Sequence, residues 1–389
     1  MAYIGAMSFH ILYEACPWHR RAALFDEQGR LLTLRLDDDL EDCQEGCVIL
    51  GRVRKVEPSL GGAFVDIGDQ NDGFLAFNTL MPEMRKAGLT EGQALLVRVA
   101  RAGFHEKGAK LDGRVSVKCP DNPGKIPCVV QKPPGVLTRA LHDSGATPVQ
   151  GWIADARLRD VMARHLPEHA IHQVDESDDT QWYERLDTEL DVMLARKPTF
   201  NFPGGNLIVE MTSAVATIDV NLTPTQGNKR DAQLAGNLLA ASHIARLCRL
   251  LDLGGSVIVD FVTPSVPSHR DVITDHLIAS FQTSDDRFVS ARRMSRHGLV
   301  EITRERIGAS LTLLLEQPHA VAGRILLDLW RTPAGRNSRV HMREVRCHPD
   351  VAHILGQRLT TEICLSHLGL PVVVKPDSAL APAAYQLLG

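Results

Sequence analysis

The sequence lacks segments that would direct it to or through a membrane. No run of about 18 apolar residues occurs, so no membrane span is expected. Residues 1–20 lack the basic start and apolar core of a signal peptide. We therefore expect a cytoplasmic protein. Its 389 residues, 44% of them hydrophobic, are enough for two or three domains with sizeable cores.

Paired cysteines and aromatic side chains are also scarce. None of the eight cysteines stands in a Cys-x-x-Cys pair, and the Cys43/Cys47 spacing of a zinc half-site has no second half. We interpret the cysteines as thiols in a reducing compartment rather than as disulfides or zinc ligands. Aromatic residues make up only 5% of the chain, so an exposed aromatic pair would point to a function.

The charges are unevenly spread, although the net charge of -4 does not favour a polyanion-binding protein. Residues 98–132 hold eight Lys or Arg against three acids, and residues 287–306 hold six Arg against two Glu. Acids gather elsewhere, as at Asp37–Asp39. This distribution fits a protein that meets phosphate on one face, whereas composition alone favours ordinary solvated charge.

Apolar periodicity predicts a mixed α/β chain of several domains. Residues 8–36 alternate around a turn at Gln28-Gly29, which predicts a β-hairpin. Short strand patterns with Gly-rich turns over residues 46–118 predict a small β-barrel. Residues 119–150 are rich in Pro and Gly and read as a linker or an irregular subdomain. Helices are predicted at residues 154–166 and 181–197.

The most informative stretch lies between residues 204 and 262. Leu207–Met211 and Ala214–Val220 predict an antiparallel strand pair, a helix follows over about 231–251, and Ser256–Val262 predicts another strand. The strands on either side of the helix should be parallel and joined by a right-handed crossover. Further on, a small terminal α/β element is predicted from a strand at 340–345, a helix at 351–365 and a strand at 372–375.

Two aspartates interrupt the apolar runs on either side of that helix. Asp219 and Asp260 lie near the carboxyl ends of these strands, where open α/β sheets place their active sites. Adjacent strands are about 4.8 Å apart, so the two carboxylates could share Mg²⁺, which also binds water and a substrate phosphate. Asn221 faces the same side as Asp219. Each Asp could instead cap the next segment, but the matched pair favours metal-dependent phosphoryl chemistry or a phosphate-binding fold.

The predicted barrel carries two aromatic residues on strands flanked by glycine. Glycine lets a strand surface be approached closely, and aromatic side chains on such barrels stack on unpaired bases. Phe64 and Phe74 are the candidates, although the strand pattern alone favours core packing for both. Lys107 and Lys110 would contact phosphates, and a solvated loop is the alternative for them.

Together these segments resemble the catalytic region of the ribonuclease E/G family. The family's OB-fold RNA-binding module is resembled by residues 51–60 (GRVRKVEPSL), 63–68 (AFVDIG) and 73–75 (GFL). Its two metal-ligand strands and its crossover helix are resembled by residues 217–221 (TIDVN), 254–261 (GGSVIVDF) and 237–246 (NLLAASHIAR). A characteristic later segment is resembled by residues 295–306 (SRHGLVEITRER). The resemblance spans roughly residues 8–315.

The resemblance implies a Mg²⁺-dependent endonuclease that cuts single-stranded RNA in RNA processing or decay. Hydrolysis would leave a 5′-phosphate on the downstream fragment. Asp219 and Asp260 would bind Mg²⁺, and Asn221 would lie beside them as a further catalytic residue. The RNA-binding residues would be Phe64, Phe74 and Lys107.

The implied fold is α/β and multidomain. A ribonuclease-H-like piece (residues 1–46 and 151–200) would receive an OB-fold barrel (47–118) and a shortened 5′-sensor-like region (119–150). A deoxyribonuclease-I-like catalytic piece (201–315) and a small C-terminal α/β domain (316–389) would follow.

The chain departs from the family pattern in several places. Thr138-Arg139 resembles the family's Arg-Thr pair in reversed order, and Arg287 falls at another phosphate-contacting position, so Arg139 and Arg287 are candidate 5′-phosphate contacts.

The zinc-linking cysteine motif is absent after Ser310. Neither zinc nor the zinc-joined dimer and its tetramer is therefore predicted, and a homodimer stays open. Thr263 replaces a second acid, which could alter metal affinity. A long scaffold tail is missing, so degradosome partners are not expected.

Two other functions stay open from the sequence. The shortened sensor region and the missing zinc link are compatible with a non-catalytic RNA-binding or ribosome-maturation factor on the same fold. A metal-dependent phosphatase or deoxyribonuclease would also use two carboxylates, but the RNA-type barrel argues against it.

Overall fold

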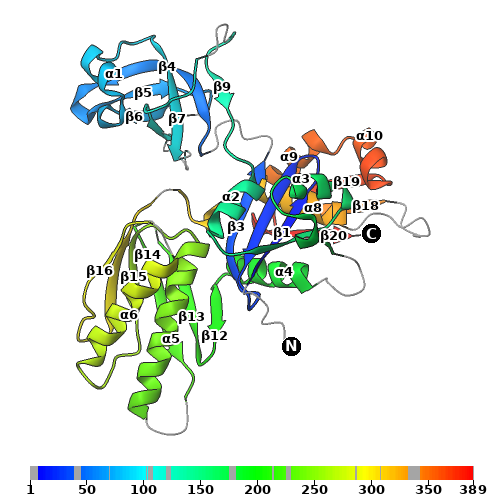
Figure 1. Ribbon diagram of the computed structural model, residues 1–389. Coiled ribbons are helices and arrows are strands. Elements are labelled where there is room, and N and C mark those ends of the chain that lie inside the picture. Colours follow the sequence, from blue (N-terminus) through cyan, green and yellow to red (C-terminus); the bar gives the residue numbers. More distant parts are fainter. Residues whose placement is uncertain are drawn as a thin grey trace. The chain divides into compact units, whose positions relative to one another are not determined.

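The chain forms two compact units, each with its own sheets and hydrophobic core (Figure 1). The computed structural model describes residues 8–38, 45–69, 71–101, 103, 108–119, 124–174, 181–212, 214–224, 229–284, 287–306, 308–331 and 342–388. One unit consists of residues 1–38, 136–306 and 310–389. The other consists of residues 39–135 with 307–309, and we call it the barrel unit.

The barrel unit contains a closed β-barrel of five strands, as the sequence predicted. The strands are β4 (Val48–Glu57), β5 (Gly62–Asp66), β6 (Gly73–Ala76), β7 (Ala94–Arg101) and β8 (Lys110–Asp112). Their order is β5-β6-β8-β7-β4, and pairing of β4 with β5 closes the ring. The β6–β8 pair is parallel and the other four pairs are antiparallel. Helix α1 (Pro82–Ala87) follows β6, and β9 (Cys128–Gln131) pairs with the outer edge of β4.

Alternation along the strands fills the barrel. In β5 and β6, Ala63, Val65 and Leu75 are fully buried, whereas the residues between them are half-exposed. A period of two places alternate side chains on opposite faces of a strand, so Phe64 and Phe74 lie on the outer surface. The core-packing interpretation of these two residues is therefore wrong.

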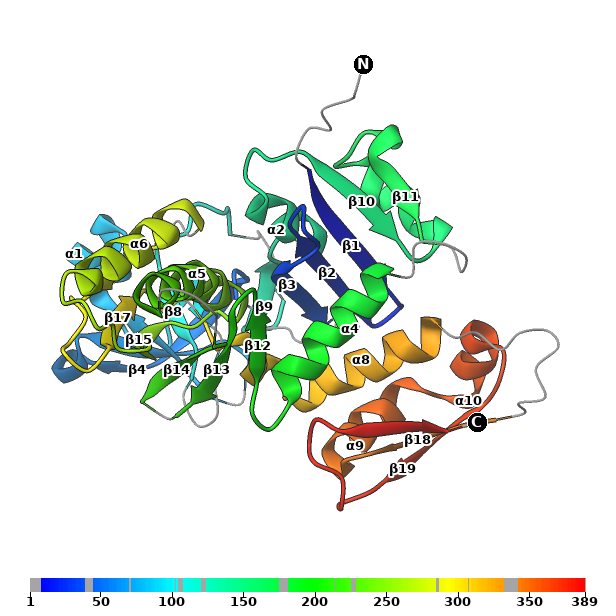
Figure 2. The ribbon, with the colours of Figure 1, turned by 90° about the horizontal axis from the view of Figure 1, so that it is seen from below.

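A five-stranded sheet begins the larger unit. Its strands are β1 (Phe9–Ala15), β2 (His19–Phe25), β3 (Leu31–Asp38), β10 (Val149–Ile153) and β11 (Ile171–Gln173), in the order β11-β10-β1-β2-β3. The first three form an antiparallel meander, and β10 and β11 run parallel to β1. Figure 2 shows α4 (Gln181–Leu194) across one face of this sheet. Ile11 and Tyr13 pack on the opposite face with α2 (Val136–Asp143).

A six-stranded sheet carries the predicted acidic residues. Its strands are β12 (Thr199–Phe202), β13 (Gly205–Met211), β14 (Val215–Leu222), β15 (Gly255–Asp260), β16 (Val289–Ala291) and β17 (Leu299–Arg304). The order is β12-β13-β14-β15-β17-β16, and the central β14–β15 pair is parallel. Helices α5 (Lys229–Leu250) and α6 (His269–Ser284) lie side by side over one face (Figure 1). The predicted strand–helix–strand unit is thus confirmed.

The C-terminal residues form a small α/β element on a long helix. Helix α7 (Leu311–Leu315) leads into α8 (Pro318–Arg331), and strands β18 (Arg343–Cys347), β19 (Val372–Pro376) and β20 (Tyr385–Leu388) form a sheet in the order β19-β18-β20. Between β18 and β19 lie α9 (Pro349–Arg358), α10 (Thr361–Ile363) and a π-helical turn (Cys364–Leu368). Figure 2 shows α8 beside this sheet.

A buried ionic cluster ties α8 to the five-stranded sheet. Glu14 on β1 is 1% exposed and accepts hydrogen bonds from Arg21 Nε (2.6 Å) and from Arg331 Nε (2.6 Å) and Nη2 (2.9 Å). Arg331 also contacts Asp187 of α4 at 3.1 Å. Burial alone would raise the pKa of Glu14, but Arg21 and Arg331 lower it to about 2.

Three predictions of secondary structure need correction. The predicted hairpin over 8–36 is a three-stranded meander, because Pro17 and Trp18 add a turn. The predicted helix over 154–166 is only a 3₁₀ turn (Ala156–Leu158) and α3 (Arg159–Ala163). Pro167 disfavours helix at the residue before it, which limits the helix at its carboxyl end. Part of the predicted linker is ordered as β9, α2 and β10.

Among the described residues, no helix is long and apolar enough to cross a membrane. The seven cysteines within those ranges are free thiols.

Candidate functional site

Asp219 and Asp260 lie directly opposite each other on the parallel strands β14 and β15. Ile218, Val220 and Val259 on either side are buried under α5 and α6, so the alternation of the strands turns both aspartates to the other face. Both carboxylates are exposed there. We call the face of the six-stranded sheet that lies opposite α5 and α6 the open face. The sequence therefore predicted the juxtaposition of the two acids correctly.

Asn221 lies beside Asp219 on the same face. Its Nδ2 donates to Asp219 Oδ2 at 3.0 Å and approaches Asn206 Oδ1 of β13 at 3.4 Å. The amide therefore fixes the orientation of one carboxylate and leaves the other oxygen of Asp219 accessible. Asn206 was not singled out in the sequence, because its position opposite Asn221 depends on the register of the β13–β14 pair.

Neither carboxylate has a cationic partner within the described part of the chain. Asn221 is the hydrogen-bond partner of the Asp219 carboxylate, and within the described residues the carboxylate of Asp260 has no hydrogen bond or ion pair. Two like charges directly across a strand pair destabilise a sheet. A hard divalent cation would remove this repulsion, and exposed carboxylate oxygens are the ligands that Mg²⁺ prefers. The residues present thus fit such a cation.

The protein provides few ligands at this position. Within the described ranges, no group of three or more His, Cys, Asp or Glu side chains gathers in a way that could hold a metal ion. Two carboxylates would leave most coordination positions to water and substrate. That pattern is typical of Mg²⁺ sites that act on phosphates.

Polar residues of α5 hold the chain that leaves β15. The buried Asn237 donates from Nδ2 to Val262 O, and Gln233 donates from Nε2 to Thr263 O, both at 2.8 Å. Thr263 itself donates from Oγ1 to His297 O at 3.0 Å. Thr263 therefore holds the neighbouring turn.

The outer surface of the barrel carries a row of basic and aromatic side chains. Phe64 and Phe74 are cross-strand partners with ring centroids 5.5 Å apart in an edge-to-face arrangement. Lys55 pairs with Phe64 on one side, and Lys110 pairs with Phe74 on the other. Both lysines are exposed. We call Lys55, Phe64, Phe74 and Lys110 the barrel row.

Glycine makes room for the barrel row. A Cβ at Gly62 would lie 2.4 Å from Phe74 Cζ, so only glycine lets that ring lie across the neighbouring strand. The sequence has no local signal that assigns Lys55 to this surface, because only the register of β4 against β5 brings it beside Phe64. The predicted Lys107 lies outside the described residues.

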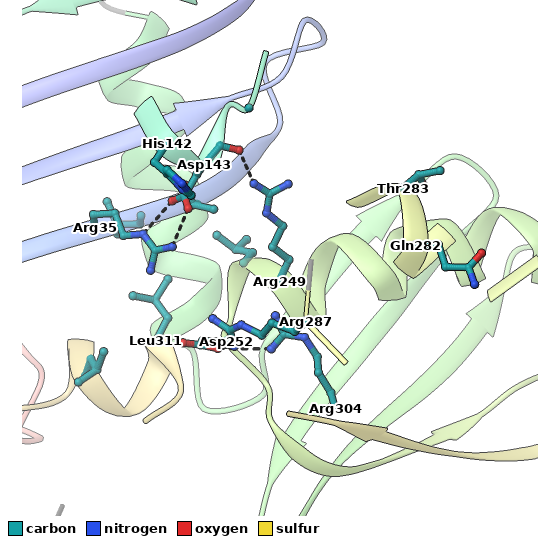
Figure 3. Close-up of a pocket in the computed structure, with 15 residues that line it drawn as sticks. Arg35, His142, Asp143, Arg249, Asp252, Gln282, Thr283, Arg287, Arg304 and Leu311 are labelled. Atoms are coloured by element: carbon teal, nitrogen blue, oxygen red, sulfur yellow. Dashed lines mark hydrogen bonds and ion pairs between the residues drawn. The ribbon is translucent and has the colours of Figure 1, made fainter. Parts of the chain in front are cut away.

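A separate cavity of about 620 Å³ lies between the five-stranded and six-stranded sheets of the larger unit (Figure 3). Its charged lining consists of four arginines, two aspartates and a histidine, namely Arg35, Arg249, Arg287, Arg304, Asp143, Asp252 and His142. With the histidine neutral, these residues carry a net charge of +2.

Each aspartate organises two of the arginines. Arg35 donates to both carboxylate oxygens of Asp143 at 2.8 and 2.9 Å, and Arg249 donates to its main-chain oxygen. Arg287 and Arg304 share Asp252. Arg287 therefore lines a cationic cavity.

The other candidate 5′-phosphate contact lies elsewhere. Arg139 is not among the residues that line this cavity, and it donates to Leu36 O at 3.1 Å.

The region that contains the acidic pair is similar to known proteins. Residues 117–307 match the ribonuclease E/G family. A chloroplastic ribonuclease E/G-like protein of Arabidopsis thaliana is 36% identical over 138 residues, which are 34% of this chain but 14% of that protein. A putative ribonuclease E of Buchnera aphidicola subsp. Baizongia pistaciae is 25% identical, over 75% of this chain and 93% of its own length. Ribonuclease G of Salmonella typhimurium is 23% identical, over 79% of this chain and 82% of its own length. The resemblance noted in the sequence is thereby confirmed.

Proposed function

Residues 117–307 are a ribonuclease E/G family segment, and from this we propose that the chain is an endoribonuclease of RNA processing or decay that cuts single-stranded RNA with Mg²⁺. The observation that carries the proposal is the exposed Asp219–Asp260 pair, which lies in register within this segment and has no cationic partner among the described residues.

Asp219 and Asp260 would hold the metal ion, and Asn221 would orient Asp219. When bound, Mg²⁺ supplies charge neutralisation at the phosphate and lowers the pKa of water. In the hydrolysis, water oxygen bonds to phosphorus and the bond from phosphorus to the 3′-oxygen breaks. The 3′-oxygen takes up a proton, so the products are a 3′-hydroxyl and a 5′-phosphate.

The barrel row would bind the RNA strand. The half-buried phenylalanines offer faces for unpaired bases, and Lys110 offers charge to phosphates, whereas Lys55 is paired with Glu57 at 2.8 Å. This surface supports a preference for single strands, since stacking requires bases that are not paired. Lys107 is proposed as a further phosphate contact from the family resemblance.

The strand orders support the finer architecture that the resemblance implies. We assign the closed barrel to the OB type because β6 and β8 are parallel in an otherwise antiparallel ring. The antiparallel meander extended by two parallel strands supports a ribonuclease-H-like piece. The two-layer sheet under α5 and α6 supports a deoxyribonuclease-I-like catalytic piece.

The cationic cavity is the proposed site for the 5′-phosphate of the RNA. Its volume is within the usual range for small-ligand sites, roughly 300–1,000 Å³. Planar guanidinium groups can bind phosphate oxygens in pairs. Arg287 would contact the phosphate from within the cavity.

A cleavage assay tests the proposed function. Purified protein is incubated with a fluorescent, A/U-rich single-stranded RNA in Mg²⁺ or in EDTA. We expect internal cuts in Mg²⁺ only, and Asp219→Asn should slow them at least about 100-fold, because several kcal/mol of transition-state stabilisation are lost. Asp271→Asn removes an exposed carboxylate from α6 and should leave the rate unchanged.

Two further readouts separate a chemical role from a folding defect. Asp219→Asn should be at least as stable as the wild type, because it removes a like-charge repulsion. Mg²⁺ should raise the melting temperature of the wild type and not that of the variant. RNA that is bound but stays intact in Mg²⁺ would refute the nuclease proposal and favour a non-catalytic RNA-binding factor.

A further inference from the structure

A tight turn lies next to Asp260 at the carboxyl end of β15. Leu299, the first residue of β17, is the cross-strand partner of Asp260, and Phe261 N donates to Gly298 O at 3.1 Å. The turn, Ser295–Gly298, therefore begins where the strand that carries Asp260 ends.

The turn is fixed in place by its own sequence. Ser295 Oγ accepts from His297 N at 3.2 Å and from Leu299 N at 3.1 Å, and Thr263 holds His297 O. Gly298 has a φ of +89°, and a Cβ there would lie 2.4 Å from Phe261 O. Glycine is thus required for the close approach of the turn to β15.

Arg296 differs from the other arginines of the β16–β17 segment in what it contacts. Arg292 pairs with Glu301, Arg293 with Asp275, and Arg304 with Asp252. For Arg296, the hydrogen-bond partner is His297 Nε2, to which its Nε donates at 2.9 Å. Within the described ranges, no carboxylate lies within 4.0 Å of its guanidinium.

The two carboxylates and the arginine at this end of β15 could be bridged by one ligand, namely an anion that binds the arginine directly and the carboxylates through a cation. Two carboxylates and one exposed arginine, each without an oppositely charged partner among the described residues, lie at the same end of β15. Cross-strand partners have Cα atoms about 4.5–5.5 Å apart, so the turn is within the reach of one ligand that also faces Asp260. A phosphodiester beside a divalent cation carries the charge that would satisfy the arginine.

We propose that Arg296 binds the phosphodiester that faces Asp219 and Asp260 and that His297 positions it. This inference rests on the proposed function. The hydrogen bond from Nε leaves Nη1 and Nη2 as a parallel pair of donors for two phosphate oxygens. His297 accepts this hydrogen bond through Nε2 and thereby orients the guanidinium.

The first test measures the number of phosphate contacts without cleavage. A fluorescent single-stranded RNA with a 5′-hydroxyl is titrated in EDTA, and the slope of log Kd against log salt is determined. Arg296→Ala should reduce the slope by about 0.7, the value for one phosphate contact on a single strand. Arg293→Ala is the matched control, because that arginine is already neutralised by Asp275, and it should retain the wild-type slope. An unchanged slope for Arg296→Ala overturns the proposal.

The second test places the contact at the cleaved bond. In Mg²⁺, Arg296→Ala should lower kcat by about 100-fold, the usual loss for one transition-state donor. Arg296→Lys should restore the salt slope but not the full kcat, because lysine lacks the paired donors. A reduced slope with wild-type kcat would place Arg296 away from the cleaved bond and overturn this assignment.

The proposed role of His297, to position Arg296, is tested by the salt slope and the kcat of His297 variants. His297→Phe should keep the salt slope and lower kcat about tenfold, since the charge remains but its orientation is lost. His297→Gln should restore most of kcat, because its amide oxygen can accept from Nε. Equal kcat in His297→Phe and wild type would refute positioning. If the wild type binds RNA without cutting it while Arg296→Ala still loses slope, the phosphate contact stands and the nuclease proposal alone fails.

Discussion

Replacing Glu14 by glutamine should destabilise the larger unit strongly although the two side chains have nearly the same shape. Glu14 is the centre of the ionic cluster that joins β1, β2 and α8. Arg21 is 1% exposed, so neutralising its partner leaves a charge in a place that water does not reach. Glutamine keeps one acceptor oxygen but removes the negative charge that both arginines require.

The magnitude follows from the pKa of Glu14. A fall from the ordinary value of 4.5 to about 2 corresponds to about 3 kcal/mol of preferential stabilisation of the charged form in the folded protein. Removal of one partner from a buried ion pair typically costs about 3–5 kcal/mol, which agrees with this figure. Because the folded-state pKa is lowered, this stabilisation is complete at neutral pH. It is lost as the pH falls from about 4.5 towards 2.

Urea unfolding followed by tryptophan fluorescence measures the effect. We expect Glu14→Gln to lower the free energy of unfolding by about 3 kcal/mol at pH 7, and the difference from the wild type to shrink below pH 4.5. Glu184→Gln, which changes an exposed residue of α4, is the control and should have little effect. A difference between Glu14→Gln and wild type that is the same at pH 7 and pH 3 would refute the electrostatic explanation.

Two predictions concern RNA. Phe74→Ala should weaken binding of single-stranded RNA in EDTA by about 1–3 kcal/mol, roughly 5- to 150-fold in Kd, because a stacking face is lost. The control Phe288→Ala removes a phenylalanine that is 67% exposed on the larger unit and should leave Kd unchanged. Arg287→Ala should abolish any preference for 5′-monophosphate over 5′-hydroxyl RNA in cleavage rate. If the wild type cuts both RNAs equally fast, the cavity is not a 5′-phosphate site.

The acidic pair was predictable because its causes are local. A strand, a helix long enough for a crossover and a second strand dictate parallel neighbours. Asp219 and Asp260, which interrupt two apolar runs, then mark the carboxyl ends of these two strands. The sequence could not give the register, in which Asp219 lies opposite Asp260 and not opposite a neighbour. It also could not show that β17 enters beside β15, since that pairing depends on contacts between distant segments.

The barrel row was only half predictable for the same reason. Phe64 and Phe74 were found from their glycine neighbours, but the row also depends on the parallel β6–β8 pairing that places Lys110 beside Phe74. The cavity had no local signal. Arg35 and Asp143 are 108 residues apart, and their ion pair exists only because β3 and α2 pack together.

The exposure of Asp219 and Asp260 on the open face explains why their charges can be left unpaired among the described residues. If Asp219 and Asp260 were buried beneath α5 and α6, each unpaired charge would lower the stability of the fold by several kcal/mol. On the open face, water screens them, so the fold tolerates two adjacent carboxylates and an arginine that do not neutralise one another. In the neighbouring segment from β16 to the end of β17, Arg292, Arg293 and Arg304 are each paired with an acid. Among the described residues, such matching is missing where β15 ends, and the proposed divalent cation and phosphodiester would together satisfy all three charges.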